Sequence, residues 1–267
     1  MITSTSNQKI KKITNLLKKT KARREEGLFA CEGRKMFLEV LTQFPERIEE
    51  AFFTEDCLAE LSEGENGAQV KDALTKIKYE TVDDKIFSQI AETVTPQGVI
   101  ALVKTPVYEL GDLLGEKTKL LVLDDLRDPG NLGTIVRTAE AAGMSGILLS
   151  KESVDITNPK VVRSTMGAIY RVPFFYAENL VETLKEIKKV KPELKAYASA
   201  LHHDSKLYNE VDYSGDVAVV IGNESNGVSE AVIGESDETI YIPMQGKVES
   251  LNAAVAAAVI MYKVQEA

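Results

Sequence analysis

The chain has 267 residues, of which 44% are apolar and 27% are charged, and its formal net charge is −9. These values are ordinary for a soluble globular protein of one or two domains. No apolar run is long enough for a transmembrane helix, and the start of the chain lacks the apolar core of a secretory signal. Two cysteines without a Cys-x-x-Cys pair argue against a disulfide framework or a zinc site and fit a cytoplasmic location.

The charge is unevenly distributed. Residues 1–35 contain ten Lys and Arg and three Glu, a local charge of +7, so the other 232 residues carry −16. The excess of positive charge in residues 1–35 predicts a basic N-terminal arm that extends from an acidic body and contacts nucleic acid. A solvated helix face would give the same charge pattern. A mitochondrial presequence is a weaker alternative for this basic stretch.

The first 105 residues predict a small α/β domain. Its first helix spans 5–27, with Thr5 and Gln8 as a capping box and Gly27 as the stop signal. The other predicted elements are a strand at 28–33, a helix at 33–44, a strand and turn at 48–56, a short helix near 56–61, a loop at 63–69, mixed helix and strand signals over 70–90, and a turn followed by a strand at 95–104. Residues 106–118 then form a linker.

From residue 119 to 267, strands and helices alternate regularly. The predicted strands are 119–125, 146–150, 170–176, 194–200, 216–222 and 238–244, and the predicted helices are 131–143, a helix from 158, 178–190, 228–235 and 250–265. Asn158 caps the second of these helices, with Pro159 at its first position. Continuous apolar strands alternating with helices predict a parallel sheet covered on both faces.

The loop between the first strand and helix of this part contains polar side chains. The strand ends near Asp125, Pro129-Gly130 make the turn, Asn131 is the expected helix cap, and Arg137 follows six residues later. No G-x-G-x-x-G occurs anywhere in the chain, which argues against a Rossmann dinucleotide site. An ordinary strand-to-helix turn with a surface arginine is an equally good interpretation of this segment by itself.

A second loop, Gly222 to Ser229, has nearly the spacing of a phosphate-binding P-loop, but Val228 replaces the essential lysine. Glu224 would repel a phosphate and suits a cationic ligand or a guanidinium instead. A tight turn in which Asn and Gly supply positive φ is the alternative. A third loop follows Pro243, with Ser250 as the expected cap of an alanine-rich helix that can pack closely against a neighbour.

Together these loops resemble the three signature motifs of the SpoU/TrmH family of RNA ribose 2′-O-methyltransferases, in the SPOUT superfamily. The matching segments are N-x-G-x-x-x-R-T-A at 131–139, G-N-E-x-x-G at 222–227, and I-P-M with E-S-L-N-A-A-V-A at 242–244 and 249–256. The segment 162–173 is also similar. More loosely, 31–41 and 95–103 resemble the family's RNA substrate-binding domain, a small α/β fold related to ribosomal proteins.

The resemblance implies a knotted catalytic domain over 119–267, S-adenosylmethionine as the cofactor, a homodimer formed through the knotted domain, and no metal. It implies methylation of 23S ribosomal RNA; a transfer-RNA methyltransferase, an antibiotic-resistance methyltransferase and a non-catalytic RNA-binding protein of the same fold are the alternatives. The cofactor residues it implies are Ala200, Leu201, Gly222, Asn223, Glu224, Ile242, Met244, Ser250 and Leu251.

The catalytic residues that the resemblance implies are Asn131, Arg137, Glu224, Ser250 and Asn252. The family's arginine has been assigned as the base, but a guanidine is a very poor base at neutral pH, so we hypothesise that it binds the RNA phosphate and stabilises the developing alkoxide. The two asparagines are expected to orient the ribose or Arg137, and Glu224 to fix Arg137 or the loop. The RNA-binding residues expected are Lys11, Lys12, Lys18, Lys19, Arg23, Arg24, Arg34, Arg137 and Arg163. The pair His202-His203 is expected to be a surface loop.

Overall fold

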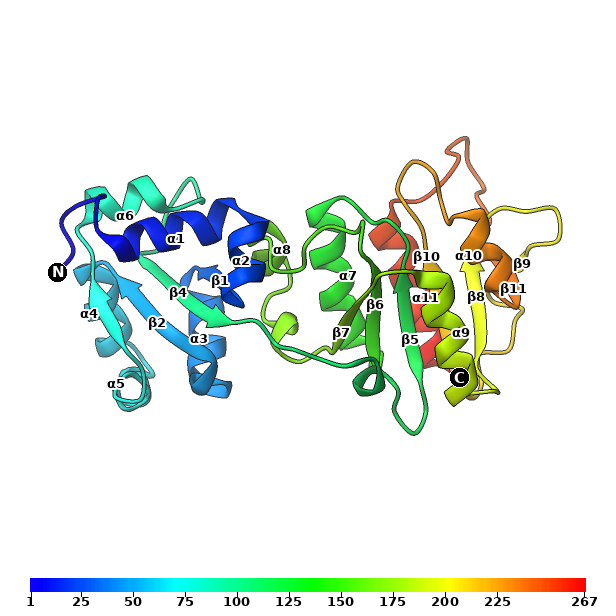
Figure 1. Ribbon diagram of the computed structural model, residues 1–267, viewed down its shortest axis with the longest axis horizontal. Helices are drawn as coiled ribbons and strands as arrows, with labels where there is room; N and C mark the ends of the chain where they lie inside the picture. Colours follow the sequence, from blue (N-terminus) through cyan, green and yellow to red (C-terminus); the bar gives the residue numbers. More distant parts are fainter. The chain divides into compact units, whose positions relative to one another are not determined.

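A computed structural model describes residues 1–267 as two compact units (Figure 1). Unit 1 contains Met1–Pro106 and Asp155–Tyr170, and unit 2 contains Val107–Val154 and Arg171–Ala267. The sequence placed 155–170 with the second domain. In the structure this segment packs on the first strand of unit 1, and Asp155 binds Arg23 there.

Unit 1 is a four-stranded sheet covered by helices. The sheet order is β1-β4-β2-β3, with β4 antiparallel to β1 and β2 and with β2 parallel to β3. The strands are β1 (Leu28–Glu32), β2 (Ile48–Phe53), β3 (Tyr79–Thr81) and β4 (Val99–Lys104), and the helices are α1 (Gln8–Lys18), α2 (Thr20–Glu26), α3 (Arg34–Gln43), α4 (Glu55–Glu63), α5 (Gly67–Leu74), α6 (Asp84–Ile90) and α8 (Pro159–Ser164). Helix α5 replaces part of the predicted 63–69 loop.

The predicted 5–27 helix is two helices. Asn7, and not Thr5, caps α1 by accepting the N–H of Lys9, and the chain becomes extended at Lys19, with φ −124°. The side chain of Arg23 donates to the carbonyls of Leu16 and Leu17, which satisfies the groups that end a helix. Gly27 ends α2 in the left-handed conformation, as predicted.

Unit 2 is a seven-stranded parallel sheet with helices on both faces, which confirms the predicted α/β class (Figure 1). The sheet order is β7-β6-β5-β10-β8-β11-β9. The strands are β5 (Lys119–Leu123), β6 (Gly146–Ser150), β7 (Phe174–Ala177), β8 (Lys195–Ser199), β9 (Lys206–Leu207), β10 (Val217–Ile221) and β11 (Glu238–Tyr241), and the helices are α7 (Pro129–Ala141), α9 (Leu180–Val190), α10 (Glu230–Glu235) and α11 (Ala253–Gln265). Asn158 caps α8 with Pro159 at its start, as expected.

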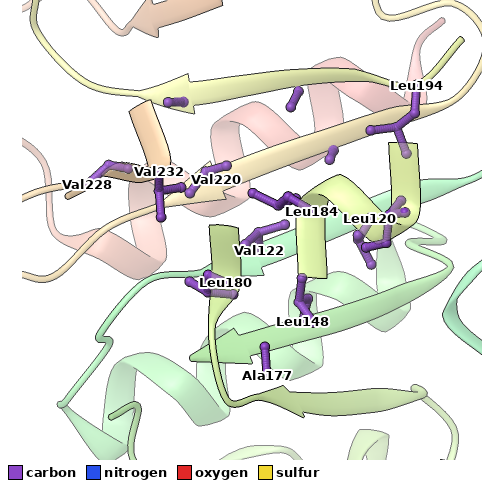
Figure 2. Close-up of a cluster of buried hydrophobic side chains, with 14 of the residues drawn as sticks. Leu120, Val122, Leu148, Ala177, Leu180, Leu184, Leu194, Val220, Val228 and Val232 are labelled. Atoms are coloured by element: carbon purple, nitrogen blue, oxygen red, sulfur yellow. The ribbon is translucent and has the colours of Figure 1, made fainter. Parts of the chain in front are cut away.

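The core of unit 2 explains why its strands are apolar throughout. Figure 2 shows one face of the sheet, where Leu120, Val122 and Val220 pack against the α9 residues Leu180 and Leu184. Helix α11 packs on the side of α7 and β10. Because both faces are covered, every residue of β6 and β10 is buried. No helix of the structure combines the length and apolarity needed to cross a membrane.

Candidate functional site

A cavity of about 800 Å³ lies at the carboxyl ends of β8, β10 and β11. Parallel strands gather their following loops at this edge, which is where α/β proteins bind ligands. The lining comes from the loops after these three strands and from the first turn of α11. All nine predicted cofactor residues open into it: Ala200, Leu201, Gly222, Asn223, Glu224, Ile242, Met244, Ser250 and Leu251.

The loop after β10 is closed by its own hydrogen bonds. Asn223 and Gly227 exchange backbone hydrogen bonds of 2.9 Å, and Gly227 has φ +69°. The side-chain oxygen of Asn223 accepts the N–H groups of Ser225 and Asn226 at 2.9 and 3.1 Å. These amides are therefore already occupied, so this loop does not form the free N–H cradle of a P-loop.

Gly222 fills the narrowest part of this loop. A Cβ added there would stand 2.1 Å from the backbone carbon of Gly227 and from the nitrogen of Val228. Only glycine lets the two sides of the turn approach this closely.

The loop after β5 begins with a strained residue. Asp125 has φ +55°, and its N–H donates to Ser150 Oγ at 2.9 Å while its carbonyl accepts Asn223 Nδ2 at 2.8 Å. The hydroxyl of Ser153 also accepts the N–H of Leu126, at 3.1 Å. Neither serine is among the predicted site residues, because neither lies in a loop that bears a recognisable motif.

The caps of the two site helices differ from those predicted. Asp128, and not Asn131, caps α7 by accepting the N–H of Asn131 at 2.8 Å. Asn252, and not Ser250, caps α11, accepting the N–H groups of Ala254 and Val255 at 2.9 and 3.3 Å. Ser250 is exposed and lies before the helix begins.

A chain of polar contacts joins the three motif loops. Asn131 Nδ2 donates to Glu224 Oε1 at 2.9 Å, and Asn252 Nδ2 donates to Asn131 Oδ1 at 2.9 Å. Because an ionised carboxylate only accepts, Glu224 fixes which end of the Asn131 amide faces Asn252. The motif residues 131, 224 and 252, distant in sequence, thus meet in one network.

Glu224 also accepts the backbone N–H groups of Arg127 and Asp128, at 3.3 and 3.0 Å. Burial by itself would raise the pKa of Glu224, but the hydrogen bonds from Asn131 and from these backbone amides outweigh it and lower the pKa below the usual 4.5. Glu224 is therefore an ionised anchor for the loop after β5. It does not contact Arg137, which lies exposed on α7 without a partner in the chain.

The expected RNA-binding residues have different environments. Lys11, Lys18, Lys19 and Arg24 are exposed and make no ion pair, whereas Lys12 pairs with Glu26 and Arg34 with Glu60. Arg163 is partly buried, and its Nη1 has no hydrogen-bond partner.

The prediction for Arg23 is wrong. Its side chain is 2% exposed and pairs with Asp155 at 2.7 Å, so it is a structural residue of unit 1.

His202 and His203 are exposed, as expected for a surface loop. His203 Nε2 lies 2.7 Å from Asp204, and His202 Nε2 lies 3.7 Å from Glu230.

The side chains around the cavity indicate the charge of its ligand. The residues that line it include the acidic residues Glu224 and Glu249 and no lysine, arginine or histidine. Such a site disfavours polyphosphates and suits a ligand with a cationic centre, such as the sulfonium of S-adenosylmethionine. The volume also lies within the range of about 300–1,000 Å³ that is usual for small-molecule sites.

Known families and proteins match both parts of the chain in sequence. The family model described as SpoU rRNA Methylase matches residues 118–262, and the model of an MRM3-like substrate binding domain matches 7–101. Among curated relatives, the 23S rRNA (guanosine(2553)-2′-O)-methyltransferase RlmP of Bacillus subtilis is 33% identical, over 98% of this chain and 97% of its own length.

Two solved structures are similar along nearly their full length. The AdoMet-bound rRNA methyltransferase of Sinorhizobium meliloti has a TM-score of 0.84 and 29% identity, covering 99% of this chain and 97% of that one. The SpoU methyltransferase AviRb of Streptomyces viridochromogenes, in complex with AdoMet, has a TM-score of 0.82 and 25% identity, covering 97% of each chain.

Proposed function

The chain belongs to the SpoU rRNA methylase family, and we propose that it transfers the methyl group of S-adenosylmethionine to a ribose 2′-hydroxyl of 23S ribosomal RNA. The observation that carries this proposal is the 800 Å³ cavity into which all nine expected cofactor residues open, beside the Glu224–Asn131–Asn252 network. The choice of ribosomal RNA is supported by relatives named as rRNA enzymes that match both units.

The cavity residues hold the cofactor, mainly through the loops after β8, β10 and β11. Bound S-adenosylmethionine supplies a methyl carbon that is already activated by its sulfonium. The protein therefore has to align the ribose hydroxyl and assist the loss of its proton, without activating the donor.

We assign the orientation of the ribose to Asn131 and Asn252. Each uses one N–H of its side-chain amide inside the network and keeps a second N–H. These remaining donors are held in fixed directions, since Glu224 determines the orientation of the first amide and the first determines the second. Glu224 acts through Asn131 and the loop, so it is a positioning residue.

Arg137 is available for RNA because it is exposed and makes no hydrogen bond or ion pair in the chain. It binds the phosphate next to the target ribose and stabilises the developing alkoxide through its planar fork. Replacing Arg137 with Lys keeps the charge and removes the fork. Near-full activity of that variant would count against this role.

The protein acts as a cytoplasmic homodimer in this proposal. Helix α11 is apolar on several sides, and Val255 and Tyr262 remain about half exposed on its outer surface. A second copy covering this surface would remove both side chains from water, and sedimentation of the full-length protein tests this. The trefoil knot implied by the resemblance stays a prediction.

Methyl transfer from labelled S-adenosylmethionine tests the function directly. Unmodified 23S RNA, small-subunit ribosomal RNA and bulk transfer RNA are offered separately, with Arg137→Ala as the control. We expect label in 23S RNA and its loss in the variant. Label confined to transfer RNA would show that transfer RNA, and not 23S RNA, is the substrate. A protein that neither binds the cofactor nor transfers label would support the non-catalytic alternative.

A further inference from the structure

A second cavity, of about 410 Å³, lies entirely in unit 1 beside α1 and α6. We call it the α1–α6 groove; its lining includes Ile10, Lys11, Thr14, Asn15, Gln89 and Ile90. Figure 1 shows the two helices side by side. None of these residues belongs to the methyl-transfer site or to the three motif loops.

The two flanks of α1 differ in how their cations are used. On one flank Lys9 bridges Glu50 and Glu80 at 2.5 Å each, which ties the helix to strands β2 and β3, and Lys12 pairs with Glu26. The hydrogen bonds from Lys9 to the carboxylates of Glu50 and Glu80 raise the pKa of its ammonium group. These lysines are committed to the protein itself.

On the groove flank the cations have no such partners. Lys11, Asn15 and Lys18 recur at helical spacing, so they line one face of α1. Both lysines are exposed and form no ion pair. The groove therefore has one cation in its lining, Lys11, that no carboxylate of the protein neutralises, and Lys18 lies about two turns further along the same face of α1.

The walls of the groove carry polar groups suited to a nucleobase. Neither the Asn15 nor the Gln89 side-chain amide makes a hydrogen bond within the protein. Each amide offers both donors and an acceptor, which is the combination that pairs with the donor–acceptor edge of a base. Ile10 and Ile90, 2% and 7% exposed, provide an apolar floor.

The charge of the groove is opposite to that of the cofactor cavity. Its lining includes one lysine and no carboxylate, whereas the cofactor cavity has two carboxylates and no cation. In a chain of net charge −9, an unneutralised basic flank beside a polar groove selects an anionic ligand. Single-stranded RNA presents phosphates together with base edges that are free to be read.

We propose that the α1–α6 groove holds an unpaired nucleotide of the RNA substrate, with its base against Asn15 and Gln89 and its flanking phosphates on Lys11 and Lys18. This rests on the proposed function in taking RNA as the ligand. The groove is thus a second point of RNA recognition, separate from the ribose that is methylated.

The test is the affinity of the full-length protein for a fluorescent ten-nucleotide single-stranded RNA, measured by anisotropy from 50 to 300 mM salt. Lys11→Ala/Lys18→Ala is expected to reduce the slope of log K against log salt by about 1.4, since each phosphate contact on a single strand contributes about 0.7. Asn15→Ala/Gln89→Ala is expected to weaken binding about tenfold and to leave the slope unchanged.

The matched control is Lys71→Ala/Lys78→Ala, which removes two other exposed, unpaired lysines of unit 1. The proposal is overturned if the groove lysines change the slope no more than this control, or if the amide variant binds like the wild type. It is also overturned if an acidic decapeptide displaces the RNA with the same dependence on Asn15 and Gln89.

Methyl transfer to 23S RNA, measured on the same proteins, separates the two proposals. A wild-type protein that binds the oligonucleotide through the groove but methylates no RNA contradicts the proposed function and supports the groove. If the wild-type protein methylates RNA and the groove variants bind the oligonucleotide as the wild type does, only the proposal for the α1–α6 groove is contradicted.

Discussion

Arg23 provides the sharpest test of the structure, because the sequence predicts it to be one RNA-binding residue among several in the basic N-terminal region 1–35. Its guanidinium donates to Asp155 Oδ2 from Nε and Nη2 at 3.0 and 2.7 Å, to the carbonyl of Leu16 at 2.9 Å and to Thr20 Oγ1 at 2.8 Å. The Arg23 side chain is 2% exposed, and that of Asp155 is 12% exposed. The contact connects α2 to the 155–170 segment.

Replacing Arg23 with Ala leaves the Asp155 carboxylate nearly buried without its cation. Breaking a buried ion pair in this way costs about 3–5 kcal/mol. At about 3 °C for each kcal/mol, the melting temperature is expected to fall by roughly 9–15 °C. Arg23→Met/Asp155→Leu, which removes both charges, is expected to lose less than Arg23→Ala.

The assay is denaturant and thermal unfolding of the full-length protein, with Arg24→Ala as the matched control. Arg24 is exposed and unpaired, so its loss should change the free energy of unfolding by less than about 0.5 kcal/mol. A free energy of unfolding for Arg23→Ala within about 1 kcal/mol of the wild type would refute the assignment of Arg23 as a buried structural residue.

Three further predictions concern other parts of the chain. Gly222→Ala should weaken S-adenosylmethionine binding at least tenfold, measured by calorimetry, because the added Cβ would stand 2.1 Å from the Gly227 backbone. Gly234→Ala, which has open space around its Cβ, should bind the cofactor normally. Equal affinities of the two variants would contradict the close approach at Gly222. Asn252→Ala should lower the free energy of unfolding by about 1 kcal/mol because it removes the α11 cap, and Ser250→Ala should leave that free energy unchanged. A larger loss of stability in Ser250→Ala than in Asn252→Ala would instead identify Ser250 as the cap. Burial raises the pKa of the Cys31 thiol to about 12 from 9.0, so the stability contributed by the neutral thiol is fully present below pH 9 and is lost as the pH rises from 9 to 12. Cys31 in the native protein at pH 9 should therefore resist iodoacetamide, and rapid labelling would contradict this.

The α/β class could be predicted because it depends on local signals. Continuous apolar strands such as β10 alternate with helices, and the sheet that they form is parallel and buried on both faces, as predicted. The loops after β10 and β11 could be located because each follows an apolar strand and contains glycine, whereas the loop after β8 was located only through the resemblance to the family.

Residue roles could not be predicted where a distant contact decides between neighbours. Arg23 and Arg24 are equivalent in the local pattern, and Asp155, 132 residues away, determines that Arg23 turns inward. Ser250 and Asn252 are both good helix caps by type. Asn252 caps α11 and also bonds to Asn131, 121 residues away.

The division of unit 1 into two chain segments has a consequence for biosynthesis. Unit 1 is complete only when residues 155–170 have been added, 64 residues after Pro106. At about 5–20 residues per second, translation of that interval takes roughly 3–13 s. During this time β1 lacks the packing of α8, and the Arg23 guanidinium lacks its carboxylate. The N-terminal part of the nascent chain therefore lacks the α8 packing and the Arg23–Asp155 ion pair until the first strands of unit 2 have been synthesised.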